Sequence, residues 1–324
     1  MTELDVTGIV VTHNSGAQIQ ATLLALRRSG IHVRVVDNAS GDDTVSVVAD
    51  SFPDVELIEN RVNVGFAAAV NQALRGVSTD VVLLVNPDCV LPPATAVELV
   101  RVLRSRPRAG IAGPRLLDAQ GRVAISAHPF ESLTSVLASR FGGNLAPVTL
   151  RRLLSGSRRR QAYDACREPG GPVTVDWLSG ACLAVRTDLL RAIGGMDEGY
   201  FLYYEDEELC LQAWQHGAEV VYVPAVEAVH IGGASSNDPT RTWPHLYRSM
   251  LRFFARHRQA SLPAVRVAVL LRAFVGIGLA GVRLPVQPRA GAARARAWTR
   301  ISRIALTSTT EVRALTTAAE ARRR

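Results

Sequence analysis

The most constraining feature of this sequence is an alternation of short apolar runs with segments of helical periodicity through roughly the first third of its 324 residues. Runs of strand length that are rich in β-branched residues occur at 6–12, 32–36, 55–58 and 81–85. Between them, apolar residues recur at helical spacing over 19–26, 44–49 and 67–75, and again after the Pro92-Pro93 pair to about residue 104. Short connections of this kind predict parallel strands joined by right-handed crossovers. Because the strands are apolar on both faces, we expect helices to cover both sides of the sheet.

Polar residues follow the ends of all four predicted strands, in the segments Thr12-His13-Asn14, Asp37-Asn38, 60–63 and Asn86-Pro87-Asp88. Asn and Asp are ordinary turn formers, so a turn explains any one of these segments by itself. Ligands of open parallel sheets bind beyond the carboxyl ends of the strands. Since all four ends carry Asn or Asp, the sequence predicts a binding site along this edge.

The rest of the chain divides into two regions at about residue 235. Before that point regular patterning returns at 173–178, and we expect helices at 189–193 and 205–216, a strand at 219–223 and a short segment at 226–230 that ends on His230. The less regular stretch 126–172 is interpreted as a surface loop or lid, with a basic segment at 158–160. Beyond residue 236 the sequence predicts helices rich in Arg and Ala.

Composition and charge narrow the class of protein without choosing a function. A hydrophobic content of 48% with 20% charged residues excludes global disorder. The net charge of +8 favours anionic partners, but nucleic acid, acidic lipid and phosphorylated substrates all fit it. The four scattered cysteines, with no C-x-x-C pair, predict reduced thiols. The N-terminus lacks a secretory pattern, so we expect a cytoplasmic site.

Two common phosphate-binding loops are missing from the sequence. It contains no G-x-x-x-x-G-K-[ST], and no G-x-G-x-x-G follows the first predicted strand, which disfavours kinases, P-loop ATPases and dinucleotide dehydrogenases. A bound nucleotide would therefore be held by side chains and a metal ion. Asp88 offers a hard carboxylate oxygen of the kind that Mg²⁺ and Mn²⁺ prefer, with substrate phosphates completing the shell. His230 is a second candidate ligand, with a hydrogen-bonded loop histidine as the alternative.

The strongest local signal is the block from Gly194 to Cys210, which joins two glycines, an aromatic cluster and four consecutive acids. Acids in a first helical turn complement the helix dipole, which accounts for part of the block. The dipole does not account for the preceding aromatic residues Tyr200, Phe201, Tyr203 and Tyr204. Aromatic walls beside a carboxylate are typical of a sugar pocket.

Taken in order, the motifs of this chain resemble those of family 2 glycosyltransferases, in particular the bacterial rhamnosyltransferase-like branch. The matching segments are 11–14, 37–42, 63–66 with Asn71, 84–88, 177–182, the block 194–210 and His230. The resemblance covers about residues 6–235. It implies a GT-A fold, an α/β architecture with a Rossmann-like, mostly parallel sheet flanked by helices. The nucleotide-binding half would be 1–115 and the acceptor and catalytic half 173–235, within a catalytic domain 1–235 followed by a basic helical region 236–324.

The resemblance also implies roles for individual residues. Asp206 matches the family's catalytic base and Glu205 its neighbour, while Asp88 and His230 would hold the metal. Asn86 stands where the family has the first acid of its D-x-D metal motif. Asp37 would accept a hydrogen bond from the pyrimidine ring N–H of the donor. The full set expected to contact the nucleotide sugar is Thr12, Asn14, Asp37, Asn38, Asn63, Gly65, Phe66, Asn71, Asn86, Trp177 and Gly180.

The function implied is inverting, metal-dependent (Mg²⁺ or Mn²⁺) transfer of a sugar from a nucleotide diphosphate. L-rhamnose from dTDP-L-rhamnose is the best guess for the donor, and UDP- or GDP-sugars stay open. The acceptor would be a lipid-linked sugar or a polysaccharide in cell-envelope glycan assembly. The alternative is a catalytically silent nucleotide-sugar-binding subunit of an assembly complex.

The C-terminal region predicts a membrane-surface partner. Arg248, Arg252 and Arg256 recur every four residues, and Arg266 and Arg272 interrupt the apolar stretch 262–282, which argues against a transmembrane helix. A basic amphipathic region on an anionic membrane surface, with the protein peripheral at the inner face of the cell membrane, fits better. Helices packed on the catalytic domain or in a homodimer interface are the alternative. The sequence has no nucleic-acid-binding motif, so we expect no nucleic acid partner.

Overall fold

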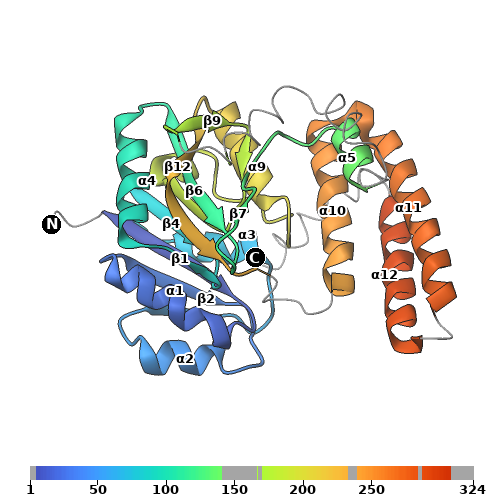
Figure 1. Ribbon diagram of the computed structural model, residues 1–324, viewed down its shortest axis with the longest axis horizontal. Coiled ribbons are helices and arrows are strands. Elements are labelled where there is room, and N and C mark those ends of the chain that lie inside the picture. Colours follow the sequence, from blue (N-terminus) through green and yellow to red (C-terminus); the bar gives the residue numbers. More distant parts are fainter. Residues whose placement is uncertain (1–4, 141–165, 167–169, 233–238, 284–286, 308–324) are drawn as a thin grey trace. The chain divides into compact units, whose positions relative to one another are not determined.

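The computed structural model describes residues 5–140, 166, 170–232, 239–283 and 287–307. These residues form two compact units, and the chain passes between them more than once. The first unit takes its described residues from 1–130, 157–197 and 205–235, and the second from 131–156, 198–204 and 236–324. The first is a sheet flanked by helices and the second is helical (Figure 1), which confirms the α/β architecture with C-terminal helices.

The central sheet of the first unit has the strand order β3-β2-β1-β4-β11-β6-β12-β5. Its strands are β1 (Val6–Thr12), β2 (His32–Asp37), β3 (Glu56–Glu59), β4 (Val81–Val85), β5 (Cys89–Val90), β6 (Ala109–Leu117), β11 (Cys182–Arg186) and β12 (Glu219–His230). The four strands predicted first along the chain are parallel neighbours. β11 runs antiparallel to both β4 and β6, and β12 is parallel to β6. Short strands β7 (Val123–Ala124) and β9 (Val173–Val175) extend the sheet, and β8 (Ala127–His128) pairs with β10 (Trp177–Leu178).

Helices cover both faces of this sheet (Figure 1). They are α1 (Gly16–Arg28), α2 (Thr44–Ser51), α3 (Phe66–Leu74), α4 (Pro93–Ser105), α8 (Thr187–Ala192) and α9 (Glu205–Gln215). One buried cluster joins α1, α2 and α4 to strand residues such as Val10 and Leu83. A second cluster joins α3, α8 and α9 to residues such as Ile9 and Leu84. Alternate residues of each strand thus enter opposite cores, which explains the uniformly apolar runs.

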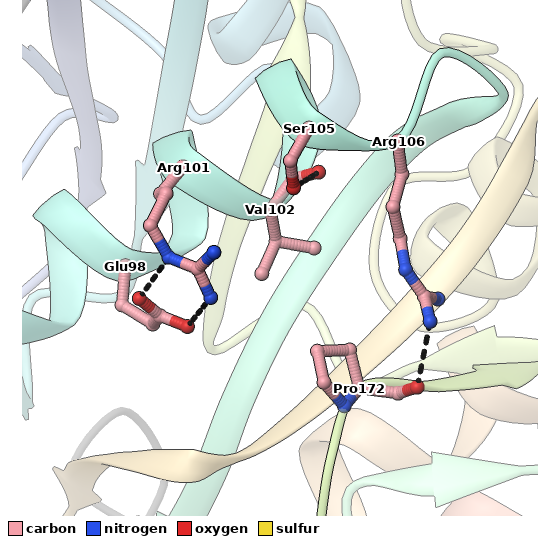
Figure 2. A network of polar contacts seen from close by, with 6 residues as sticks. All are labelled: Glu98, Arg101, Val102, Ser105, Arg106 and Pro172. Atoms are coloured by element: carbon pink, nitrogen blue, oxygen red, sulfur yellow. Dashed lines mark hydrogen bonds and ion pairs between the residues drawn. The ribbon is translucent and has the colours of Figure 1, made fainter.

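The C-terminal end of α4 is fixed by polar contacts to a distant part of the chain (Figure 2). Arg106 donates a hydrogen bond of 3.1 Å to the carbonyl oxygen of Pro172, shortly before β9. One turn earlier, the exposed Arg101 pairs with Glu98, and the Ser105 hydroxyl donates to the Val102 carbonyl. These contacts end the helix just before β6 begins.

Three features of the sheet go beyond the sequence-based expectation. The regular segment 173–178 forms two strands, β9 and β10. The strand expected at 219–223 continues through the segment 226–230 as one strand, β12, with an irregularity after Val223. β6 was not predicted, because its sequence contains Gly110, Gly113 and Pro114. Glycine is required at position 110, because a Cβ there would lie 2.5 Å from the Leu189 side chain. Of the expected loop 126–172, most, including 158–160, lies outside the described residues.

The second unit is built from helices α5 (Leu133–Arg140), α10 (Pro239–His257), α11 (Leu262–Arg283) and α12 (Pro288–Leu306), with a 3₁₀ turn at Gln259–Ser261. α12 packs against both α10 and α11 (Figure 1). The Trp298 ring lies between them, with its centroid 5.2 Å from that of Trp243 on α10. The Arg272 guanidinium of α11 lies 4.6 Å from the Trp298 ring, so the middle of α11 contacts this core.

The aromatic cluster before α9 belongs to the core of the second unit, not to an open wall. Tyr200 and Tyr204 are buried, and the Arg252 guanidinium lies 5.2 Å from the Tyr200 ring. Tyr203 keeps 40% of its surface exposed. Arg252 itself is buried, so the stripe predicted from the spacing of Arg248, Arg252 and Arg256 is not a continuous basic surface. The reason is that α10 is covered on all sides around this residue.

Candidate active site

The carboxyl ends of the parallel strands meet at one edge of the sheet, as predicted. Thr12 lies beside Asp37 in the β1–β2 register, and β4, which leads into Asn86, pairs with β1 on its other side. Backbone hydrogen bonds extend the pairing just beyond the strand ends. The Asn38 N–H donates to the Thr12 carbonyl at 2.8 Å, and the Asn60 N–H donates to the Asp37 carbonyl at 2.8 Å. Among the described residues, the buried Thr12 hydroxyl has no hydrogen-bond partner. An unsatisfied buried hydroxyl at this edge fits a ligand contact.

The loops after β1 and β2 are locked together by side-chain hydrogen bonds. The Asn14 N–H donates to the Ser40 hydroxyl at 2.8 Å, and the Asn14 Oδ1 accepts from the Gly41 N–H at 2.7 Å. The buried Asp37 carboxylate accepts from the Ser40 N–H at 2.9 Å and from its hydroxyl at 2.5 Å. His13 joins the same network through the carbonyl of Asn38, at 2.9 Å from Nδ1. Ser40 and His13 were not predicted as site residues, although both stand inside the matching motifs.

Other residues expected to contact the donor hold the backbone of this edge. The Asn38 amide donates to the Gly65 carbonyl at 3.2 Å and accepts from Asn60 at 3.0 Å. The Asn63 side chain accepts from the Gly65 N–H at 3.0 Å. Gly65 precedes α3 with φ +88°, a conformation that favours glycine, and Phe66 is the first, half-buried residue of the helix. These contacts shape the turn into α3.

Asn71 and Trp177 make contacts that join separate segments. The Asn71 amide donates to the Met196 carbonyl and accepts from the Met196 N–H, both at 2.8 Å. At the same turn, a Cβ on Gly195 would lie 2.5 Å from the Asn71 Oδ1. The Trp177 indole donates to the Pro129 carbonyl at 3.0 Å, and its ring stacks on His128 at a centroid distance of 4.4 Å.

The β5–β12 pairing brings the two candidate metal ligands together although they are far apart in sequence. His230 lies opposite Cys89 in the antiparallel register, which places its Nε2 3.2 Å from the Asp88 Oδ1. The Asn86 amide nitrogen lies 3.3 Å from the same Nε2. No cluster of three or more His, Cys, Asp or Glu residues that could hold a metal occurs in the described part of the chain. The Asp88 carboxylate fits Mg²⁺ and Mn²⁺, which take their remaining ligands from phosphates and water, whereas an imidazole is the preferred ligand of softer transition metals.

The two candidate catalytic carboxyl groups open α9. The Asp206 Oδ2 accepts from the Gly180 N–H at 3.0 Å and its Oδ1 from the Glu207 N–H at 2.9 Å. Burial raises the pKa of Asp206, whereas these hydrogen bonds lower it. Burial, and then the charge of Asp206, raise the pKa of Glu205 to about 8. The Glu205 Oε2 is buried and has no partner among the described residues. The backbone N–H groups therefore favour the charged form of Asp206, and Glu205, with its pKa raised to about 8, keeps its proton at neutral pH.

Gly180 acts as a positioning residue for Asp206, a role that sequence reasoning did not assign to it. A Cβ at this position would lie 3.3 Å from the Asp206 Cβ. The next residue, Ala181, accepts a main-chain bond of 2.9 Å from the Asn86 N–H. The short segment 180–181 therefore connects the edge that carries Asp88 with the start of α9.

The sheet and its flanking helices have the GT-A fold, which solved structures of other proteins share. A solved mannosyltransferase, PcManGT from Pyrobaculum calidifontis in complex with GDP-Man and Mn²⁺, has the same fold with a TM-score of 0.53 at 19% identity. That likeness covers 93% of this chain and 86% of the mannosyltransferase. Residues 7–152 match the model of glycosyl transferase family 2, so this part of the chain is similar to the domain of that family.

Two relatives share most of the chain. N-acetylglucosaminyl-diphospho-decaprenol L-rhamnosyltransferase of Mycobacterium tuberculosis is 29% identical over 265 residues, which is 77% of this chain and 84% of the relative. Rhamnosyltransferase WbbL of Escherichia coli is 24% identical over 262 residues, 77% of this chain and 92% of the relative. The family match covers the strand edge with Thr12, Asp37 and Asp88, whereas Asp206 and His230 lie beyond residue 152.

Proposed function

We propose that this protein is an inverting, metal-assisted glycosyltransferase that transfers L-rhamnose from dTDP-L-rhamnose to a lipid-linked or polysaccharide acceptor in cell-envelope glycan assembly. The names of the two relatives support the sugar, and the Mycobacterium tuberculosis relative, named for a diphospho-decaprenol substrate, supports a lipid-linked acceptor. UDP- and GDP-sugars are the alternative donors. With such an acceptor, the enzyme would act in the cytoplasm at the inner face of the cell membrane.

The observation that carries this proposal is the Asp206 carboxylate, held by two backbone N–H groups beside a neutral Glu205. Both bonds fix the orientation of the carboxylate, and each oxygen keeps a lone pair. Burial raises the pKa of Asp206, which makes it a better proton acceptor than an exposed carboxylate, while the hydrogen bonds from backbone N–H groups act in the opposite direction and favour its charged form. Asp206 would take the proton of the acceptor hydroxyl as that oxygen bonds to the anomeric carbon and the diphosphate departs.

A single base of this kind implies inversion at the anomeric carbon. In a one-step displacement the acceptor enters opposite the leaving group, and no enzyme carboxylate bonds to the sugar. Glu205, being protonated, does not compete as a nucleophile or base. Because Glu205 is neutral, it places no second negative charge beside Asp206.

The strand edge would hold the donor. Thr12 has a free hydroxyl there, and Asp37, although bonded to Ser40, has lone pairs left for a base N–H. Asn14, Asn38, Asn63 and Gly65 would keep the edge in shape. Asp88 and His230 would hold a divalent metal, which when bound neutralises charge that develops on the leaving diphosphate.

The test begins with donor binding. A thermal-shift screen of dTDP-L-rhamnose, UDP-sugars and GDP-mannose, each with and without Mn²⁺, should raise the melting temperature most for the true donor with metal. Transfer is then measured with that donor and a polyprenyl-diphosphate GlcNAc acceptor, and the anomeric configuration of the product is determined by NMR. A retained configuration would overturn the single-displacement mechanism, and a larger shift with another sugar would replace rhamnose.

The alternative, a catalytically silent nucleotide-sugar-binding subunit, separates from the enzyme in the same experiment. A silent subunit would show the donor-dependent thermal shift without product for any acceptor. Retention of Asp206, Asp88 and His230 in one unit, with the Asp88–His230 contact formed, favours the enzyme.

A further inference from the structure

Helix α11 presents a long apolar face to solvent. Seven of its large apolar side chains are exposed: Val267, Leu271, Phe274, Val275, Ile277, Leu279 and Val282. Phe274 and Val282 keep 78% and 76% of their surface. Val267, Leu271, Phe274 and Val282 recur at helical spacing and form one stripe, and a Cβ on the intervening Gly278 would meet nothing within 4 Å. An exposed apolar patch of this extent marks an interaction surface.

The opposite face of α11 is already occupied within the second unit. Its small residues Ala273, Gly276 and Ala280 are buried, and a Cβ on Gly276 would lie 2.4 Å from the Trp298 ring of α12. The exposed stripe is therefore not the face that holds the helices together. It is a second surface that the described residues leave uncovered.

The neighbouring helix α12 presents a stripe of a different chemistry. Arg289, Arg296, Arg300 and Arg303 are exposed and recur at helical spacing, so they share one face. The other face of α12 buries Trp298 and Ile301. Two packed helices thus offer an apolar stripe and an arginine stripe.

The charge of this region selects the chemistry of the partner. Residues 239–307 contain thirteen arginines and no aspartate or glutamate. A second copy of the chain would bring an equally basic region to the interface, which is repulsive. An anionic bilayer supplies both an apolar interior and surface phosphates.

The arginine stripe also borders a pocket with room for a phosphate group. An open pocket of about 320 Å³ lies between α10 and α12, lined by Thr240, Arg241, Arg296 and Arg300 among others, with no carboxylate in its lining. Burial and the neighbouring Arg300 and Arg248 lower the pKa of His245, as expected where positive charge is concentrated. The pocket suits a lipid phosphate better than it suits a cation.

The same helix passes a length-and-composition test for crossing a bilayer. In the part of the chain that the structure describes, the stretch 259–283 is long and apolar enough, and its most apolar segment has a mean hydropathy of 1.9. However, a third of its most apolar window is buried, and Arg272 stacks on Trp298 inside the unit. A helix held on one side by α12 is better placed to lie on a bilayer than to cross it.

We propose that α11 and α12 form a docking surface for an anionic lipid bilayer, with the apolar stripe of α11 inserted among the acyl chains and the arginine stripe of α12 on the lipid phosphates. The inference rests on the proposed function for its purpose, since a lipid-linked acceptor resides in such a bilayer. Its physical basis, exposure and charge, is independent of that function.

Vesicle flotation of the full chain tests this surface. The protein should float with phosphatidylglycerol vesicles, far less with phosphatidylcholine vesicles, and less with either as salt increases. Leu271→Gln with Phe274→Gln should weaken binding about tenfold or more. Arg296→Gln with Arg303→Gln should weaken it about fivefold for each arginine. Gln is a good helix former, so these exposed changes preserve the helices.

Matched variants in the first unit control for a general loss of hydrophobicity or charge. Val97→Gln with Val123→Gln removes two exposed apolar side chains, and Arg101→Gln with Arg104→Gln removes two exposed arginines from α4. Neither pair should change flotation more than twofold, by roughly the size of a screened long-range charge effect. Equal loss in test and control pairs would show a non-specific effect and overturn the inference.

Two further outcomes separate this inference from its rivals. If the α11 pair turns a dimer into a monomer in analytical ultracentrifugation and leaves flotation unchanged, the stripe is an interface between copies and the bilayer proposal is wrong. Flotation needs neither donor nor transfer, so Asp206→Asn should float like the wild type. Absence of transfer with intact flotation would refute the proposed function alone. Transfer without flotation would refute the docking surface alone.

Discussion

The strand edge of the first unit and the helical surface of the second differ in whether their side chains have partners within the protein. At the edge, Asn14, Asn38 and Asp37 are bonded to neighbouring loops, so the geometry exists before any ligand binds. On α11 and α12, apolar and arginine stripes face solvent, and no acid occurs nearby in sequence. A prearranged edge suits a small polar donor, because the reacting atoms of that donor must be positioned precisely for transfer. An uncompensated surface suits an extended partner.

The largest expected effect tests whether the chemistry lies in the first unit. Asp206→Asn keeps the size of the side chain and removes the proton acceptor, so transfer should fall by about 10²–10⁴-fold. Donor binding, measured by thermal shift, should change little. Asp188→Asn, at an exposed acid of the same unit paired with Arg186, is the control and should leave the rate unchanged. Near-normal turnover of the Asp206 variant would show that Asp206 is not the catalytic base.

The second prediction asks which residues of the edge hold structure and which hold donor. Asn71→Ala leaves both main-chain groups of Met196 without their partner, so unfolding free energy should fall by about 2 kcal/mol. Donor affinity of the folded protein should stay the same. Thr12→Val should do the opposite: stability is kept or gained, because the hydroxyl has no partner among the described residues, and donor affinity falls. Urea unfolding and donor titration check both, and a reversed pattern would exchange the two roles.

The third prediction compares two glycines of α11. Gly276→Ala places a methyl group against the Trp298 ring, so the second unit should lose about 1–3 kcal/mol. Gly278→Ala points into open space and should gain about 0.5–1 kcal/mol, because alanine favours the helix. Denaturant unfolding of both variants measures the difference. Equal effects would mean that the packed and exposed faces of α11 are not distinct.

The last prediction concerns pH and the buried acid of the first unit. The pKa of Glu205 in the folded protein, about 8, lies above the ordinary value of 4.5 for a glutamate, so the native state binds more protons than the unfolded state between these two pH values. Stability should therefore fall as pH rises through this window, by up to about 1.4 kcal/mol per pH unit for one group. Glu205→Gln should flatten the slope in urea unfolding. Glu98 is half-buried, and the hydrogen bond from Arg101 lowers its pKa, so it titrates below this window and Glu98→Gln should leave the slope unchanged.

Local pattern was enough to predict the first four strands, the helices between them and the polar edge that they share. Alternate residues of each strand pack into the two cores on opposite faces of the sheet. Burial on both faces is the reason that each predicted strand is an uninterrupted apolar run. β6 escaped prediction because its position against α8 requires glycine at 110, and glycine weakens any strand signal. Tyr200 and Tyr204 resemble pocket walls in sequence, but they pack beside Arg252 and Phe253 of a helix that begins some forty residues later.

The sequence by itself determined that an α/β sheet would carry Asn and Asp at its strand ends, because the periodicity of burial and the chemistry of turns are local properties. Tertiary structure alone decided that His230 meets Asp88, since the register of β12 on β5 sets that distance. It also decided that Gly180 holds Asp206, that Arg252 is buried, and that the apolar stripe of α11 is left exposed. Each of these depends on which distant segment occupies the space beside a residue, and no local pattern encodes that.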